Sequence, residues 1–191
     1  MKGLKVSSSE EMGIRRGREG DEQALEELLE SLQDEGEVWK KMMVPKGMEK
    51  SWIHNLTKDD RVHNKERPGK WLFFAFDSDK MIGHVNGIAW DRAPPESKQH
   101  IEDTKARYNL VSRNVGHVGI AVHKDYRRKG VGEKLMQTAI EEAKELGVEV
   151  LTASINTENK PMIRLAETLR FKEHMRERKG ERESVLMTLE P

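Results

Sequence analysis

This sequence of 191 residues contains no cysteine, and its 34 basic and 34 acidic side chains cancel to a formal net charge of +0. The absence of cysteine excludes disulfides, thiolate metal sites and a cysteine nucleophile, and the charge balance argues against bulk attraction to nucleic acid or membrane. The length suggests a single domain, residues 1–191, with residues 1–10 poorly ordered. The lack of a signal peptide or membrane-length apolar run predicts a cytoplasmic protein.

The N-terminal third predicts a strand followed by helical segments. Residues 12–18 favour a short strand, and Asp21 is a plausible cap for a helix whose apolar face is Ala24, Leu25, Leu28, Leu29 and Leu32. Gly36 is expected to end or bend this helix. Helical spacing then continues through a second apolar stripe, Val38, Trp39, Met42 and Met43. We interpret this stripe as core or pocket wall.

A β-hairpin and a long polar connection follow. Residues 71–76 and 81–90 predict two antiparallel strands joined by a turn at 77–80. Residues 91–114 are polar, and a helix is expected near 97–108 within them. Connections of this length in compact domains are usually functional or mobile, so this segment is a candidate part of a binding site.

The stretch 115–146 combines a strand, a basic glycine turn and a helix. A strand over 115–122 leads through a polar loop into the turn Arg127, Arg128, Lys129, Gly130, Val131 and Gly132. Apolar residues that recur about every 3.6 residues predict that a helix then runs to Gly147. The first N–H groups of a helix lack intrahelical partners and glycine admits close approach, so the turn predicts a phosphate or pyrophosphate site.

Two known phosphate-binding motifs do not describe this turn. The mononucleotide loop needs GxxxxGK[ST], which is absent here, and Leu135 replaces the third glycine of the dinucleotide fingerprint. A basic turn that merely starts a helix remains an alternative at this point. The rest of the chain predicts a strand over 148–155, a helix over 159–169, and strands over 171–176 and 184–189. This order implies a mixed sheet with helices on both sides.

The glycine turn resembles the [QR]-x-x-G-x-[GA] signature of the GNAT superfamily of acyl-CoA-dependent N-acyltransferases. Arg127, Gly130 and Gly132 occupy its fixed positions. The approach to Arg127 is similar to the family's V-x-P-x-Y-R, with Lys124 in place of the proline. The resemblance covers residues 70–189 well and the first 70 loosely. It implies an α/β (α+β) fold with a mostly antiparallel sheet of six to seven strands flanked by helices on both faces.

A second segment, 159–171, is partly similar to the family's N-x-x-A-x-x-L-Y-x-x-x-G-F. It departs from that pattern at Met162, Ala166 and Arg170. These departures leave open a second class of function, a CoA-binding sensor or interaction module without transferase activity. A phosphate-binding protein unrelated to CoA is a third class.

The resemblance implies acetyl-CoA as cosubstrate, no metal, and direct attack of a primary amine on the thioester in a ternary complex. The pyrophosphate would lie on backbone N–H groups of residues 128–132, and the pantetheine arm would run beside the strand 120–122. The Ile120 N–H would hold the oxyanion. The implied cofactor-binding residues are Ile120, Ala121, Val122, Arg127, Arg128, Lys129, Gly130, Val131, Gly132 and Asn159.

The general base is not fixed by the sequence. Many relatives carry an acid or imidazole on the strand before the signature, on the face that alternation here gives to Gly116 and Val118. His117 is a candidate base, but period-two alternation turns it to the opposite face unless a bulge resets the register. His84, a water chain or a glutamate of 91–114 are alternatives.

The acceptor is expected to be a small-molecule or peptide amine, bound between segments 36–60 and 91–114 by a monomer or homodimer. In many relatives a tyrosine protonates the departing CoA sulfur, and the matching position here is Ala166, which cannot. The tyrosines of the chain are Tyr108 and Tyr126. Because a CoA thiolate is a tolerable leaving group, transfer is predicted not to depend on a tyrosine acid.

Overall fold

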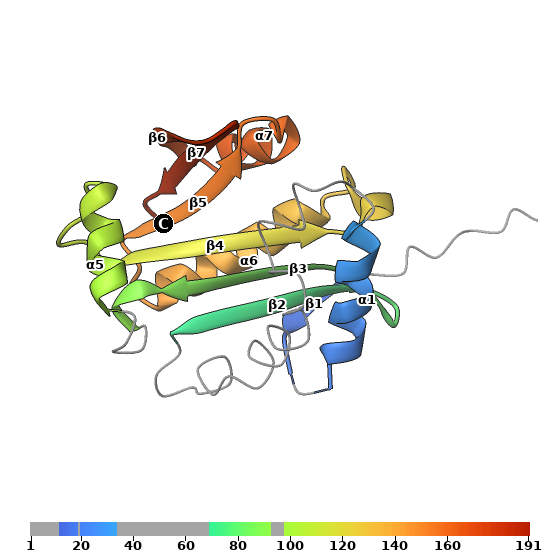
Figure 1. Ribbon diagram of the computed structural model, residues 1–191. Coiled ribbons are helices and arrows are strands. Elements are labelled where there is room, and N and C mark those ends of the chain that lie inside the picture. Colours follow the sequence, from blue (N-terminus) through green and yellow to red (C-terminus); the bar gives the residue numbers. More distant parts are fainter. Residues whose placement is uncertain (1–11, 19, 34–68, 93–97) are drawn as a thin grey trace, which may run out of the picture.

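The computed structural model describes residues 12–18, 20–33, 69–92 and 98–191, and seven strands in that part of the chain form one sheet (Figure 1). The strand order is β1-β2-β3-β4-β5-β7-β6. Every recorded pair is antiparallel except β4 with β5, which is parallel. The expectation of a mixed, mostly antiparallel sheet of six to seven strands with helices on both faces is confirmed.

The elements follow the chain order that the sequence predicts, with small differences at their ends. The strands are β1 (Gly13–Arg16), β2 (Lys70–Asp77), β3 (Lys80–Ala89), β4 (Val115–Val122), β5 (Val150–Asn156), β6 (Lys172–Lys179) and β7 (Arg182–Leu189). The helices are α1 (Glu22–Gln33), α5 (Lys98–Arg107), α6 (Val131–Glu145) and α7 (Lys160–Thr168). The expectations for residues 1–10, for the helical stripe 38–43 and for the pocket wall 36–60 lie outside the described residues.

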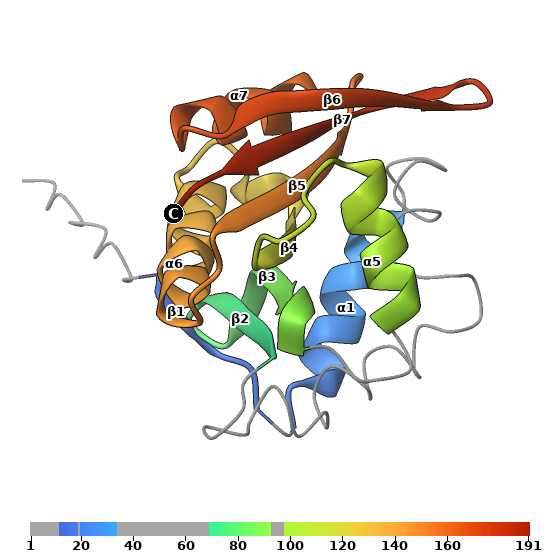
Figure 2. The same cartoon turned by 90° about the vertical axis from the view of Figure 1, so that its left-hand side faces the viewer.

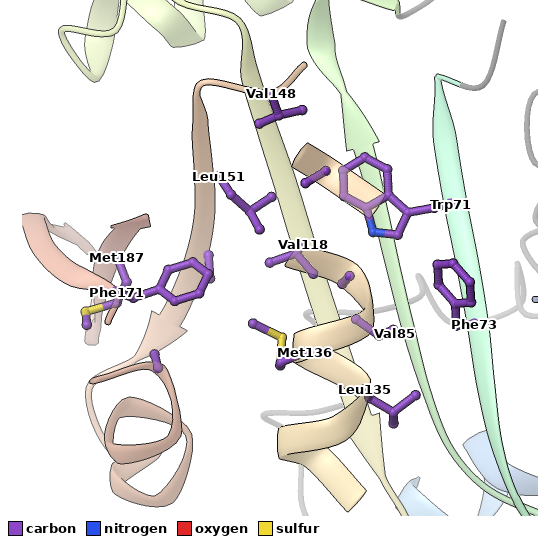
Figure 3. Packing of buried hydrophobic residues seen from close by; sticks show 14 of the residues in the cluster. Trp71, Phe73, Val85, Val118, Leu135, Met136, Val148, Leu151, Phe171 and Met187 are labelled. Atoms are coloured by element: carbon purple, nitrogen blue, oxygen red, sulfur yellow. The ribbon is translucent and has the colours of Figure 1, made fainter. Parts of the chain in front are cut away.

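The sheet separates two layers of helices. In Figure 2, α6 lies on one side of the sheet, and α1 and α5 lie on the other. Successive side chains of β2 point to opposite faces of the sheet. Trp71, Phe73 and Ala75 join the large cluster under α6, whereas Leu72 and Phe74 pack with α1. Figure 3 shows Val118, Leu135 and Met136 among the side chains of the α6 cluster. Both faces of the central strands are therefore covered, which fixes the register of each strand.

Helix α1 begins directly after Asp21, as predicted, but the Asp21 carboxylate does not bond to the helix in the recorded contacts. It accepts hydrogen bonds from the Arg18 N–H at 2.8 Å and from both terminal nitrogens of Arg15 at 2.7 and 2.8 Å. A bidentate guanidinium pair is charge-assisted and stronger than a neutral cap, which accounts for the difference. This pair ties the start of α1 to β1.

Helices α6 and α7 end in the same hydrogen-bonded motif. The residue after each C-cap is left-handed, Gly147 with φ 73° and Arg170 with φ 68°. In both helices the next residue donates its N–H to the carbonyl five residues earlier, at 2.9 Å. This is the Schellman arrangement, in which glycine is usual. Arg170 is therefore a strained residue at a position where the GNAT pattern has glycine.

Candidate functional site

Strands β4 and β5 are paired only at one end. The recorded register joins Val115 to Val150, Gly116 to Leu151 and His117 to Thr152, and stops there. Beyond this point the two strands diverge, β5 turning toward β7 (Figure 1). In the described part of the chain no strand pairs with this side of β4 after His117. Residues 118–122 therefore present a free strand edge, onto which an extended ligand can add by main-chain hydrogen bonds.

The register of β4 decides which peptide groups lie on that free edge. His123 donates its N–H to the carbonyl of Ile82 on β3 at 2.9 Å, and the β3–β4 pairing continues without a shift. Peptide groups alternate along a strand, so those of Ile120 and Val122 face away from β3, toward the opening. The N–H of Ala121 faces β3. Of the three strand residues implied by the resemblance, Ile120 and Val122 thus offer backbone groups to a ligand.

The turn after β4 brings an uncapped helix start to the end of this edge. Gly130 is the N-cap of α6 and adopts the left-handed conformation with φ 83°. Among the described residues no side chain caps it, and the first recorded backbone bond runs from the Lys134 N–H to the Gly130 carbonyl at 3.1 Å. The N–H groups of Val131, Gly132 and Glu133 precede that bond. They and the helix dipole form a site suited to an anion.

Positive charge surrounds the turn. Arg127 donates its Nε–H to the carbonyl of Val122 at 3.0 Å, which places its guanidinium at the free edge of β4. Arg128, left-handed with φ 59°, and Lys129 are exposed. Lys129 Nζ lies 5.2 Å from the centre of the Tyr126 ring, within cation–π range.

Lys80 is a further cation of this group, and the sequence did not predict it. It is the first residue of β3, directly after the β2–β3 turn, and its Nζ lies 5.5 Å from the centre of the same Tyr126 ring. Burial lowers the pKa of His123, and the charge of Lys80 lowers it further. The only sequence signal for Lys80 was its place in a hairpin turn, because its partner lies far along the chain.

The lack of a side chain at Gly132 is explained by helix packing and not by the close approach of an anion. A Cβ there would lie 3.2 Å from Leu165 Cδ2 on α7 and 3.8 Å from the side chains of Ile120 and Val122. At Gly130, by contrast, a Cβ would meet nothing within 4 Å. Gly132 thus allows α6 to approach β4 and α7, whereas Gly130 is the open position of the turn.

Helix α7 borders the opening opposite β4, and its cap is Asn159. The carboxamide oxygen of Asn159 accepts a hydrogen bond from the Met162 N–H at 3.2 Å. This hydrogen bond engages the carboxamide oxygen of Asn159 and not its NH₂ group. Ala166, which stands for the family tyrosine, is fully buried at 0% exposure in the core cluster.

His117 lies at the point where β4 and β5 separate. Alternation turns it away from Gly116 and Val118, as expected, and no bulge intervenes. Gly116 and Val118 share the other face of β4, as alternation predicts, and that face is packed, because Val118 joins the α6 cluster and a Cβ at Gly116 would lie 3.1 Å from Val148. His117 instead faces the α1 and α5 side, and burial lowers its pKa to about 4.

Other polar groups share the face of His117. His84 and Asn86 alternate to it on β3, opposite Ala121 and Gly119. His84 is fully buried, and burial lowers its pKa to about 4. The Asn86 Oδ1 is buried without a hydrogen-bond donor among the described residues. A Cβ at Gly119 would lie 3.5 Å from that oxygen.

Each tyrosine of the chain makes side-chain contacts of its own. Tyr108 donates its hydroxyl to Glu177 Oε2 on β6 at 3.2 Å, and burial raises its pKa. Tyr126 packs edge-to-face on His123 with ring centres 5.7 Å apart. A hydrogen bond with Asp77 raises the pKa of Tyr126. Neither contact places a phenol beside Ile120.

The described residues contain no helix that is both long and apolar enough to span a bilayer. Within the same residues no group of three or more histidine and acidic side chains could hold a metal ion.

Comparison with known proteins gives a consistent result. The sequence profile of the acetyltransferase (GNAT) family matches residues 25–171. The chain is similar in structure to a GNAT-family acetyltransferase from Streptococcus pneumoniae, with a TM-score of 0.67 at 18% identity over 94% of this chain and 98% of that one. It is also similar to yncA from Salmonella typhimurium, whose structure contains its cofactor acetyl-CoA (TM-score 0.64, 20% identity, 94% and 93% coverage). A third similar structure is ribosomal-protein-alanine N-acetyltransferase from Brucella melitensis (TM-score 0.64, 21% identity, 94% and 99% coverage).

Proposed function

The chain belongs to the acetyltransferase (GNAT) family, and on that premise we propose that it transfers an acetyl group from acetyl-CoA to a primary amine in a ternary complex. The observation that carries this proposal is the continuity of two ligand-binding features. The free edge of β4 ends at the turn where the uncapped start of α6 and its basic side chains gather. One extended molecule with a pyrophosphate at one end fits both.

The proposed binding mode assigns a role to each residue of the turn. The pyrophosphate accepts hydrogen bonds from backbone N–H groups of residues 128–132, and Arg127, Arg128 and Lys129 add positive charge. Lys80 strengthens this field from the neighbouring hairpin. The pantetheine arm pairs with the backbone of Ile120–Val122 like an added strand, and the NH₂ of Asn159 reaches it from α7.

The proposed reaction needs no covalent enzyme intermediate. The amine nitrogen bonds to the thioester carbon, the Ile120 N–H stabilises the oxyanion, and the C–S bond then breaks to release the CoA thiolate. The proton lost by the nitrogen passes to His117. Ile120 lies three residues beyond His117, about 10 Å along the strand. The imidazole side chain spans part of this distance, and a bridging water carries the proton over the rest.

The low pKa of His117 fits this role in one respect and limits it in another. At about 4 it leaves the imidazole neutral, with a free lone pair, at physiological pH. Such a weak base cannot deprotonate a free ammonium group efficiently, but it can accept the far more acidic proton of the cationic nitrogen formed by attack. The Asn86 Oδ1 on the same face is an acceptor for an N–H of the incoming amine.

Two of the three departures from the family pattern are explained by packing. Ala166 fills the core and Met162 packs against it, while Arg170 carries backbone strain at a helix end. These residues therefore do not favour a binding module over an enzyme. The acceptor is proposed only as a primary amine of a small molecule or a peptide.

A charge-matched pair of variants tests the pyrophosphate assignment. Gly130→Asp and Gly130→Asn have side chains of equal size, both residues tolerate the left-handed conformation, and the position has open space. Gly130→Asp adds a negative charge where the anion is proposed to bind, so it should weaken acetyl-CoA binding at least tenfold more than Gly130→Asn does. Isothermal titration with acetyl-CoA measures this, and ATP serves as the competing phosphate ligand.

Equal affinities of the two variants would contradict the site, and tighter binding of ATP than of acetyl-CoA would contradict the cosubstrate. Release of CoA thiol in the presence of a panel of amines tests the transfer itself. If thiol release does not depend on any amine, the proposed reaction is wrong even where acetyl-CoA binds.

A further inference from the structure

His117, Thr152 and the Gly116 carbonyl form a continuous hydrogen-bonded chain at the point where β4 and β5 separate. His117 Nδ1 lies 3.0 Å from the Thr152 hydroxyl oxygen. The same hydroxyl donates to the Gly116 carbonyl at 2.9 Å. Thr152 has 0% exposure, so its hydroxyl is shielded from solvent. His117 and Thr152 are also the last paired residues of the two strands, which fixes their relative position through the sheet.

The number of protons available in this hydrogen-bonded chain determines the tautomer of the His117 imidazole. A carbonyl oxygen only accepts, so the bond to Gly116 uses the single hydroxyl proton of Thr152. Thr152 can then only accept from His117, and Nδ1 must carry a proton. In a neutral imidazole, the form that the lowered pKa of His117 favours at pH 7, the other nitrogen then bears the lone pair. The free lone pair of His117 is on Nε2.

We infer that Thr152 is a positioning residue that holds His117 in the tautomer with the proton on Nδ1, so that Nε2 is the atom left to accept a proton. This inference rests on the proposed function, since it assigns a partner to the proposed base. The arrangement uses a hydroxyl and a carbonyl where other catalytic histidines use a carboxylate, so it orients the ring without adding a negative charge that would raise its basicity.

The tautomer can be measured without any assay of activity. Protein labelled with ¹⁵N in histidine gives distinct long-range ¹⁵N–¹H correlation patterns for the two neutral tautomers, and the His117→Gln variant assigns the signal. At pH 7.5 we expect His117 to carry its proton on Nδ1. Thr152→Val should shift it toward the other tautomer or a mixture, and Thr152→Ser should restore the original pattern.

Thr188 offers a matched control. It pairs with Thr152 across β5 and β7 and lies on the same face of the sheet, but no contact with His117 is recorded for it. Thr188→Val removes the same hydroxyl from the neighbouring strand. It should leave both the His117 signal and the turnover unchanged.

The kinetic consequence follows from the value of general base catalysis, about 10²–10⁴-fold. Thr152→Val should lower kcat at least tenfold with an unchanged Kd for acetyl-CoA, and Thr152→Ser should recover most of the loss. A proton on Nε2 in the parent protein, or a tautomer that survives Thr152→Val, would overturn the inference. So would an unchanged kcat in a variant whose tautomer has shifted.

Failure of the proposed function gives a different result. A parent protein that binds acetyl-CoA but acetylates no amine would refute the transfer, while the correlation spectrum would still show whether Thr152 sets the tautomer. If His117→Gln keeps full turnover, the base assignment fails and with it the catalytic meaning of Thr152.

Discussion

Replacing Arg170 by glycine should stabilise this protein. Arg170 is exposed and holds φ at 68° in the Schellman motif that ends α7. The left-handed conformation costs a residue with a Cβ about 1–2 kcal/mol. Glycine removes that strain, but it also gives the unfolded chain more conformational freedom, which reduces the gain in stability by about 0.5–1 kcal/mol. The net expectation for Arg170→Gly is a gain of about 0.5–1 kcal/mol, or about 1–4 °C in Tm for a chain of this size.

The end of α6 supplies the reverse experiment. Gly147 occupies the same position of the same motif with φ 73°, and a Cβ there would approach nothing closer than Asn114 Nδ2 at 4.0 Å. Gly147→Arg should therefore lower the stability of the protein by about as much as Arg170→Gly raises it. The double variant should have nearly the same stability as the parent. Urea and thermal unfolding followed by circular dichroism measure all three. An Arg170→Gly variant that is less stable than the parent would refute the assignment of strain.

Three further predictions concern charge and protonation. The folded pKa of His84, about 4, lies below its unfolded value of 6.5, so the unfolded chain binds more protons between these values and stability falls as pH drops through that window. Urea unfolding of His84→Gln should show a loss between pH 7 and pH 4.5 that is about 2–3 kcal/mol smaller than in the parent; an equal loss would show that His84 is not buried neutral. Lys80→Gln should weaken acetyl-CoA binding about two- to fivefold at low salt and less at high salt in titration calorimetry, and an effect independent of salt would exclude a role through charge. Tyr108→Phe should keep its turnover within about tenfold of the parent, whereas a loss of 10²–10⁴-fold with intact acetyl-CoA binding would identify Tyr108 as a general acid.

Local patterns were sufficient to predict the scaffold. The aromatic and β-branched residues of 71–76 and 81–90, the helical spacing after Gly130 and the glycine at 147 each depend on neighbours along the chain, so the sequence carried them directly. The same holds for the anion-binding character of the turn 127–132, which comes from helix geometry. The departure at Arg170 was visible in the sequence, but its meaning was not, because the backbone conformation of that residue belongs to the folded helix end.

The candidate site depended on contacts between distant segments. The opening beside Ile120 exists because β5 leaves β4 after three paired positions to join β7, and no local pattern specifies where two parallel strands part. Lys80 reaches Tyr126 only because the folded sheet brings the start of β3 beside residues 124–126. These positions follow from the packing of both sheet faces, a property of the whole sheet.

His117 shows most clearly which properties depend on the local sequence and which depend on the tertiary structure. Its sequence neighbours determine that it faces away from Gly116 and Val118, because side chains alternate along any strand. Whether that face is core or open, and which nitrogen carries the proton, depends on Thr152, which is 35 residues further along the chain. A side chain's direction is a property of its own strand, whereas its proton and its exposure are set by the strands and helices that pack against it.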